Sequence, residues 1–251
     1  MKFVEDANLP LMAASVIIGE KYAEILREPL KKLGIEAIPM PDNPQIDRRL
    51  SGHADISVLH LGGDKMLLAP YLMNSAFAHK LRERGFRTEY ADIAQAPNYP
   101  DDAQLNICAA GKYVIYSKVN SYPPIVNYFT NIHKKKAVES RQGYARCSSC
   151  VVNSTAIITS DGGIYRAAIA AGMDVLKIRP GYIELPGFDY GFIGGAAFKI
   201  SDKTMAFTGN LDAHPDKAAI IDYLGLHNIE ALFLTDKHAF DIGSAIPAEE
   251  K

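Results

Sequence analysis

The stretch "HADISVLHLGGDKMLLAPYLMNSAFAHKLRERGFRTEYADI", residues 53–93, carries the pattern that decides the fold. Polar and apolar residues alternate through "DISVLHL", a turn follows at residues 62–64, and "KMLLA" runs back, which predicts a hairpin. An apolar pattern around Phe77 and Leu81 then predicts a helix that stops at Gly85. The extended "FRTEYADI" completes the order strand, strand, helix, strand.

The same order recurs in the segments that begin at Gln104, Arg146 and Asp189. Their predicted hairpin turns lie near residues 111, 154 and 202, and the first turn lies near residue 63, so the period is roughly 45 residues. A repeated unit of this kind cannot bury its own sheet and helix faces, so several copies must pack against one another.

The two ends of the chain supply the parts of a fifth unit. "SVIIG" at residues 15–19, "EKYAEILREPLKKLG" and "IEAIPM" predict its second strand, helix and third strand, but no good first strand precedes them. We expect "FDIGSAI", residues 240–246, to pair beside residues 15–19 and supply it. The predicted fold class is α/β, a five-bladed α/β propeller of strand-strand-helix-strand repeats closed by the C-terminal strand, in one domain over residues 1–251.

Composition excludes several classes of function. The chain has 251 residues, of which 48% are hydrophobic, and its net charge of −2 offers no basic field for nucleic acid. No apolar run reaches the roughly 20 residues of a membrane span, and the N-terminus lacks the apolar core of a secretory signal. Three cysteines fit a reducing compartment. We therefore expect a cytoplasmic protein without nucleic-acid or membrane partners.

The repeat, together with "GHADISVLHLGG", "QGYARCSSCVV", "GFIGGAAFKI" and "DIGSAI", resembles the penteins, or guanidine-modifying enzymes, and more narrowly a bacterial branch of that fold. The resemblance covers nearly the whole chain. It implies a Cys nucleophile, a His and carboxylates near the axis, which attack the guanidinium carbon and form a covalent amidino intermediate that water or an amine resolves. The catalytic Cys of those enzymes lies near the C-terminus, where this chain has Ser244 beside Gly243.

Other residues must therefore carry any such chemistry. Residues two apart in a strand share a face, so His53 would point with Asp55, and Asn106 and Cys147 would lie on the inner strands of neighbouring units. Converging near the axis, these side chains would line a competent cavity, with Cys147, Asp55 and His53 as catalytic residues and Asn106 binding substrate. The alternative is that they lie at strand ends, solvated or capping backbone groups.

The cysteine pair in "RCSSC" has several interpretations. Cys147 and Cys150 in a regular strand would lie about 10 Å apart, beyond disulfide reach, so a redox pair is disfavoured. A zinc site needs two further ligands, and the sequence has no second Cys pair and no paired-His motif, so no metal is predicted. Cys147 is the candidate nucleophile, whereas Cys150 and Cys108 are expected in the core.

Two aspartates and a serine complete the candidate site. Asp189 and Asp241 each precede a glycine-containing segment, which predicts that they occupy equivalent places at the rim of the central opening. There they could bind a cationic ligand. The alternative is that each aspartate only forms a turn. We add Ser244 to this substrate-binding set. No phosphate-loop or dinucleotide motif is present, so no cofactor is expected, and the chain could form a homo-oligomer.

Three functions remain open on these grounds. The first is a hydrolase or amidinotransferase that acts on a small guanidino or amidine compound through Cys147. The second is a non-catalytic protein that binds a small cationic molecule and has lost the C-terminal catalytic Cys. The third is a structural or partner-binding protein, which an axial opening filled by apolar side chains would support.

Overall fold

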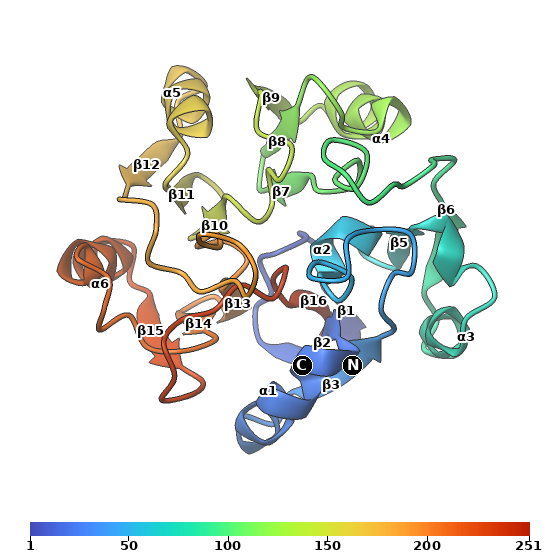
Figure 1. Ribbon diagram of the computed structural model, residues 1–251, viewed down its shortest axis with the longest axis horizontal. Helices are drawn as coiled ribbons and strands as arrows, with labels where there is room; N and C mark the ends of the chain where they lie inside the picture. The colour runs from blue at the N-terminus through green and yellow to red at the C-terminus, as the bar shows by residue number, and fades with distance from the viewer.

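The computed structural model describes residues 1–251 and contains five small sheets arranged around a common centre (Figure 1). Four of them have the same chain order, with two antiparallel strands, a helix, and a third strand parallel to the second. The helices that join the second and third strands of these units lie at the periphery of Figure 1, and the first strand of each unit lies nearest the centre. The predicted repeat is therefore confirmed.

The first two of these units lie between residues 58 and 140. One consists of β4 (Val58–Gly62), β5 (Lys65–Leu68), η1 (Pro70–Leu72), α3 (Ala76–Glu83) and β6 (Arg87–Tyr90). The next consists of β7 (Cys108–Ala110), β8 (Tyr113–Ser117), α4 (Pro123–Asn127), η2 (Tyr128–Ile132) and β9 (Lys136–Ser140). Their hairpin turns fall where the glycine-containing turns were predicted.

The next two units lie between residues 150 and 233. One consists of β10 (Cys150–Val151), β11 (Ala156–Thr159), α5 (Gly162–Ala170) and β12 (Asp174–Lys177). The other consists of β13 (Ala197–Ser201), β14 (Thr204–Phe207), α6 (Lys217–Leu226) and β15 (Glu230–Phe233). In both, the helix carries the chain from the second strand to a third strand parallel to it, the usual crossover between parallel strands.

The fifth sheet combines both ends of the chain. Its order is β1 (Lys2–Phe3), β16 (Ile246–Glu250), β2 (Ala13–Gly19) and β3 (Glu36–Met40), with α1 (Glu20–Lys32) between β2 and β3. Ile246 pairs with Ile17, so a C-terminal strand does complete this unit, as predicted. The predicted residues are wrong, however, because the strand begins at Ile246 and residues 240–245 form a loop.

Apolar side chains join each unit to its neighbour. There are five large buried clusters, and each contains residues from two adjacent sheets. In one of them, Ile158 of β11 packs with Met205 of β14 and Leu224 of α6. Burial between units therefore supplies what a single three-stranded sheet lacks. The longest helix, α1, has 13 residues, so no helix is long enough to cross a lipid bilayer.

The predicted strands around the candidate residues are shorter than expected. His53 precedes a short helix, α2 (Ala54–Ser57), and β4 begins only at Val58. Asn106 lies just before β7, and Cys147 lies in a turn before β10. The predicted alternation of strand faces is therefore wrong for these residues. They come together for a different reason, since each lies where the chain enters the first strand of its unit.

Candidate functional site

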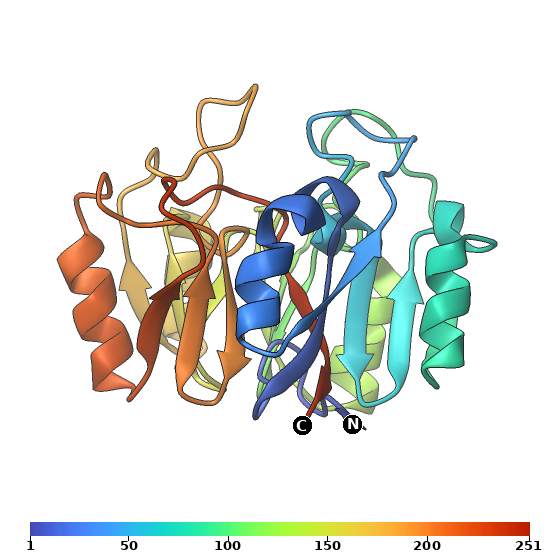
Figure 2. The same cartoon turned by 90° about the horizontal axis from the view of Figure 1, so that it is seen from below.

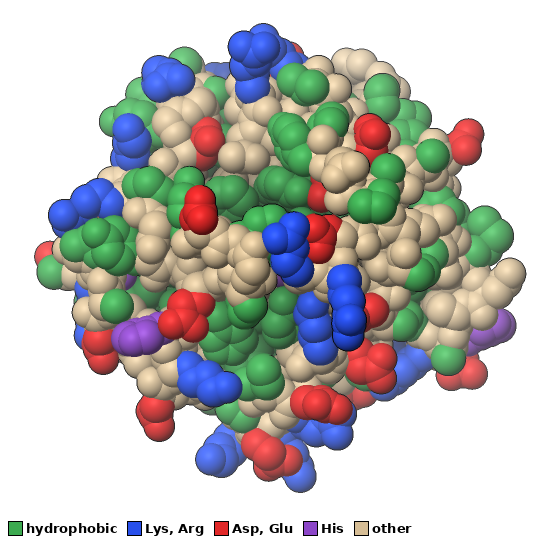
Figure 3. Space-filling view, viewed as in Figure 1, with side chains coloured by type: hydrophobic (Ala, Val, Ile, Leu, Met, Phe, Trp, Pro, Cys, Tyr) green, Lys and Arg blue, Asp and Glu red, His purple; other side chains and the backbone are tan.

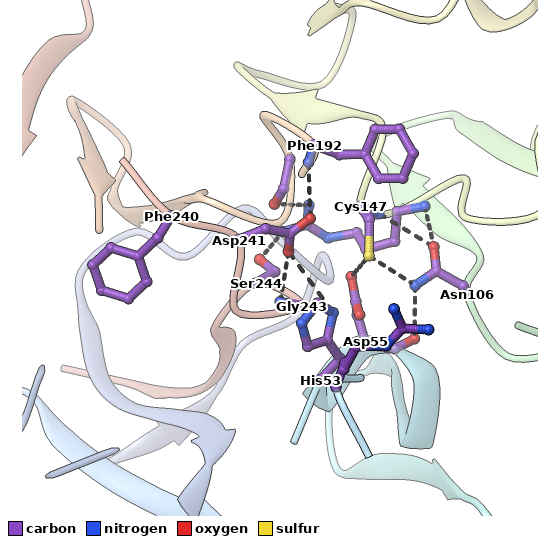
Figure 4. Close-up of polar contacts among 12 residues, drawn as sticks. His53, Asp55, Asn106, Cys147, Phe192, Phe240, Asp241, Gly243 and Ser244 are labelled. Atoms are coloured by element: carbon purple, nitrogen blue, oxygen red, sulfur yellow. Dashed lines mark hydrogen bonds and ion pairs between the residues drawn. The ribbon is translucent and has the colours of Figure 1, made fainter. Parts of the chain in front are cut away.

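The five segments that enter the first strands are connected to one another by hydrogen bonds. Each bond links one unit to the next, and together they form a circle at the centre of the molecule. The bonds run from Asp55 N to Gly243 O (3.1 Å), Asn106 Nδ2 to Asp55 O (3.3 Å), Cys147 N to Asn106 Oδ1 (3.2 Å), Gly195 N to Cys147 O (2.9 Å) and Ser244 N to Gly195 O (2.9 Å). The circle places residues from all five units at one site (Figure 4).

Cys147 and Asp55 form the central contact of this site. The Cys147 thiol donates to Asp55 Oδ2 at 2.8 Å, and Asn106 Nδ2 donates to the sulfur at 3.3 Å (Figure 4). All three side chains are buried. Asn106 is held in place because its Oδ1 atom accepts the backbone N–H groups of Arg146 and Cys147. The predicted convergence of these three residues is therefore what the structure shows.

Burial determines the protonation of the central pair. Desolvation, followed by the nearby Asp55 charge, raises the pKa of Cys147 well above its ordinary value. Desolvation also raises the pKa of Asp55, although the hydrogen bond from the thiol opposes this. In the resting protein the sulfur thus holds its proton and directs it at the carboxylate.

His53 and Asp241 lie beside this pair. Burial lowers the pKa of His53 to about 3, so its ring is neutral near pH 7. Burial raises the pKa of Asp241 to about 7. The backbone N–H groups of Phe192 and Gly243 donate to this carboxylate at 2.8 and 2.9 Å, and these hydrogen bonds lower its pKa by less than burial raises it. His53 Nδ1 lies 3.8 Å from Asp241 Oδ1, which is beyond hydrogen-bond distance.

Two glycines allow this close packing. A Cβ atom at Gly195 would lie 1.9 Å from Asp241 Oδ1, and one at Gly243 would lie 2.3 Å from the Cβ atom of His53. Gly243 also has a φ of +66°, a conformation that residues with a Cβ atom rarely adopt. No other residue type fits at either position without displacing a side chain of the site.

Arg146 is a buried cation that was not among the predicted site residues. Its side chain donates to Asn8 Oδ1 (2.9 Å), Ser149 O and Gly194 O (both 3.1 Å) and Ser244 Oγ (2.7 Å). Its positive charge lowers the pKa values of Asp55 and Asp241, against the larger effect of burial. The only signal in the sequence was an arginine directly before the candidate cysteine.

Replacing Arg146 by glutamine is expected to lower the free energy of unfolding by roughly 3 kcal/mol, because buried acceptors and two carboxylates lose their cation. Urea denaturation followed by circular dichroism measures this. Arg141→Gln, at an exposed position nearby, is the control and should change stability by less than about 0.5 kcal/mol. Equal midpoints for the two variants would contradict the assigned role.

A cavity of about 240 Å³ opens above the pair on the face shown in Figure 3. Four aromatic residues, two carboxylates, two leucines, a histidine and a cysteine line it. They are Tyr144, Phe188, Tyr190, Phe192, Asp189, Asp241, Leu50, Leu185, His53 and Cys147. Figure 2 shows the loops of this face on the opposite side from both chain termini.

The seven predicted site residues occupy three depths. His53, Cys147, Asp189 and Asp241 line the cavity, with Asp189 exposed and the other three buried. Asp55 and Asn106 lie behind Cys147 and contact its sulfur.

Ser244 lies deeper still, where its hydroxyl accepts from Arg146 and the cavity does not reach it. Asp189 and Asp241 are therefore not in equivalent environments. Asp241 is buried at the centre of the molecule before β16, whereas Asp189 is exposed on a surface loop. The aromatic lining was missed because most of it comes from that loop, which has no periodic pattern.

A larger cavity of about 500 Å³ adjoins the first and shares Asp241 with it. Its lining includes four basic residues, Lys21, Arg48, Arg49 and Lys237. Arg49 is paired with Asp47, but Arg48 and Lys237 form no ion pair. The smaller cavity is thus aromatic and acidic next to the thiol, and the larger one beside it carries four cations together with the carboxylates Glu184 and Asp241.

Sequence comparison places nearly the whole chain in one family. The model of the "Family of unknown function (DUF6873)" matches residues 17–246. No curated protein matches the sequence.

Solved structures show a similar arrangement of the whole chain. An inosamine-phosphate amidinotransferase from Streptomyces griseus matches with a TM-score of 0.63 and 11% identity, over 100% of this chain and 97% of that one. An agmatine deiminase from C. jejuni matches at 0.55 and 9%, over 98% and 97% of the two chains. DDAH from Pseudomonas aeruginosa matches at 0.56 and 6%, over 95% and 100%. At these identities the likeness shows the fold and leaves the chemistry to the site itself.

Proposed function

We propose, from the premise that the chain belongs to the family DUF6873 and has the predicted pentein fold, that it modifies a small guanidino or amidine compound through Cys147. One observation carries the proposal. A thiol that lines a cavity donates its proton to a buried carboxylate 2.8 Å away, within a circle of hydrogen bonds that joins all five units. The same circle supports a closed five-bladed propeller.

The lining of the smaller cavity suits a flat cation. A guanidinium group stacks on aromatic faces and forms paired hydrogen bonds with carboxylates. Four aromatic side chains and Asp241 and Asp189 offer both kinds of contact. A cation between them would also offset the cost of burying Asp241. The cavity is not filled by apolar side chains, so a purely structural role receives no support.

The reaction follows from the positions of three groups. Asp55 accepts the thiol proton while the Cys147 sulfur attacks the guanidinium carbon. One carbon–nitrogen bond breaks, the proton passes from Asp55 to the departing amine, and an S-amidino cation remains on Cys147. Water or an acceptor amine then attacks the same carbon and restores the thiol, which gives hydrolysis or amidino transfer respectively.

The surrounding residues position these groups. The Asn106 amide donates to the sulfur and would stabilise the thiolate that forms as the proton leaves. His53 lines the cavity with a neutral ring, so a ring nitrogen can accept a hydrogen bond from an incoming water or amine and orient it. Ser244, at the position where the resemblance implies a cysteine, faces Arg146 and takes no part.

Mass spectrometry of the intact protein tests the proposal. After incubation with a panel of guanidino compounds and acid quenching, one amidino group should be found on the Cys147 peptide, together with free amine or urea product. Binding without any adduct or product would favour the second candidate, a non-catalytic protein for a small cationic ligand. This second candidate is supported by Ser244, which stands where the resemblance implies the catalytic cysteine but is buried and hydrogen-bonded to Arg146.

The basic cavity predicts a preference among substrates. Arg48 and Lys237 have no ion-pair partner, so a substrate with a negatively charged tail should place that tail there while its guanidinium lies beside Asp241. Arginine is therefore expected to bind roughly tenfold more tightly than agmatine, which lacks the carboxylate.

Isothermal titration calorimetry with both compounds measures this preference. The double variant Arg48→Ala/Lys237→Ala should bind the two compounds equally, whereas Lys203→Ala, on the turn between β13 and β14, should keep the difference. Equal binding to the unmodified protein would refute the role of the basic cavity. It would leave the proposed reaction at Cys147 untouched.

The remaining expectations become part of the proposal. We infer a cytoplasmic protein whose partner is a small cationic or zwitterionic molecule, without nucleic-acid or membrane partners. The formal net charge of −2 supports the absence of a nucleic-acid partner. Association of the chain into a homo-oligomer stays a prediction.

A further inference from the structure

Three buried side chains of the central site have the donor atoms of a metal centre. His53, Asp55 and Cys147 each offer one ligand atom, and these atoms lie within 4.8 Å of one another. No metal was predicted from the sequence because it has no second Cys pair and no paired-His motif to supply two further ligands. The structure brings them from a different unit, where α2 and the residue before it lie beside the turn that holds Cys147.

Two polar atoms of this cluster lack a partner. Asp55 Oδ1 and His53 Nε2 are buried and form no hydrogen bond, whereas nearly all buried polar atoms in proteins have one. A substrate in the cavity does not supply the partner for Asp55, because Asp55 does not line that cavity. A single ion seated between the sulfur and the imidazole would reach the carboxylate.

We propose that His53, Asp55 and Cys147 bind one divalent transition-metal ion, with Zn²⁺ as the best match. Nitrogen, oxygen and sulfur donors in one set suit zinc, and three protein ligands with a fourth position facing a cavity are typical of open zinc sites. On binding, the thiol proton leaves to solvent and a zinc–thiolate bond forms. No change in oxidation state is required.

The neighbouring residues fit this role. The Asn106 N–H group that faces the sulfur would hydrogen-bond the bound thiolate. The Cys147 sulfur and Asp55 Oδ2 are 2.8 Å apart, closer than two ligands of one zinc. They must separate by roughly 0.7 Å on binding, which a small side-chain rotation provides.

The metal site does not require the proposed reaction, although Cys147 cannot serve both at the same time. A zinc-bound Cys147 cannot attack a guanidinium carbon, so in an enzyme the ion would compete with substrate for the sulfur. The site would exist equally in a non-catalytic protein. Failure of either proposal therefore leaves the other standing.

Cobalt titration of the metal-free protein tests the site without any assay of activity. Co²⁺ should bind one to one and give a thiolate-to-cobalt charge-transfer band together with the intense visible bands of four-coordinate cobalt, and Zn²⁺ should displace it. Cys147→Ser should abolish the charge-transfer band. Asp55→Asn and His53→Gln should each weaken binding by roughly 100-fold or more, since even the loss of an outer-shell partner costs about 10- to 100-fold.

The control variants are Cys150→Ala, three residues away in the core, and Asp189→Asn, at the cavity but outside the cluster. Both should keep the band. A second measurement needs no variant: Zn²⁺ should protect Cys147 of the unmodified protein from alkylation by iodoacetamide, as read by peptide mass. Absence of the band and of protection, or a band that persists in Cys147→Ser, would overturn the proposal.

Discussion

Replacing Cys147 by serine is expected to reduce the turnover of a guanidino substrate by roughly 10⁴-fold or more, since removal of a covalent nucleophile has effects of this size. Serine keeps nearly the same shape and can still donate to Asp55, so the fold and the cavity should remain. Substrate affinity should change little. A rate assay on the best compound of the panel, with calorimetry for binding, separates the two effects.

Cys150→Ala is the matched control for the nucleophile. Cys150 lies three residues further along, on β10, where its sulfur contacts Met205 in an apolar cluster. Its sulfur faces Met205, whereas the Cys147 sulfur faces the proton acceptor Asp55, so Cys150 is an unreactive core thiol. This variant should lose some stability and keep its turnover. A Cys147→Ser protein with undiminished turnover would rule out the covalent mechanism.

Replacing Asp55 by asparagine is expected to reduce turnover by roughly 100-fold or more, because the thiol proton loses its acceptor. Asparagine has the same shape, and it removes a buried carboxylate whose Oδ1 atom has no partner. The variant should therefore be as stable as the original protein or more stable. Loss of turnover with retained or improved stability identifies a chemical role and excludes a purely structural one.

The test of Asp55 depends on a split between kinetic constants. Asp55 does not line the cavity, so kcat should fall while KM stays within a few-fold of its original value. Asp101→Asn, an exposed aspartate in the segment before Asn106, serves as the control and should change neither constant. A change in KM alone would place Asp55 in substrate binding and contradict the mechanism.

Much of the architecture was predictable from local patterns. The turn at Gly62-Gly63 and those near residues 111, 154 and 202 were found where glycine or polar residues interrupt apolar runs, and each separates the two strands of a hairpin. Helix stops at Gly85 and Gly172 were likewise visible, and both glycines have positive φ. These features depend on a few neighbouring residues, so a single sequence contains them.

The site was only partly predictable. Three of its residues, Asp55, Asn106 and Cys147, were identified as converging, but from an argument about strand faces that does not apply. Residues 54–57 form a helix whose Asp55 N–H group bonds to Gly243, nearly two hundred residues away in sequence. A contact of that kind overrides the local preference for a strand, and no local pattern reveals it.

The sequence by itself determined the units of this protein: their order, their turns, their helices and the need for the C-terminus to complete the first sheet. Only the tertiary structure decided the chemistry, by bringing the thiol of Cys147 to a carboxylate 92 residues earlier and surrounding both with Arg146, Asp241 and an aromatic loop. The reason is physical. Periodicity reflects the contacts of a residue with its own strand or helix, whereas reactivity depends on burial and charge contributed by distant segments.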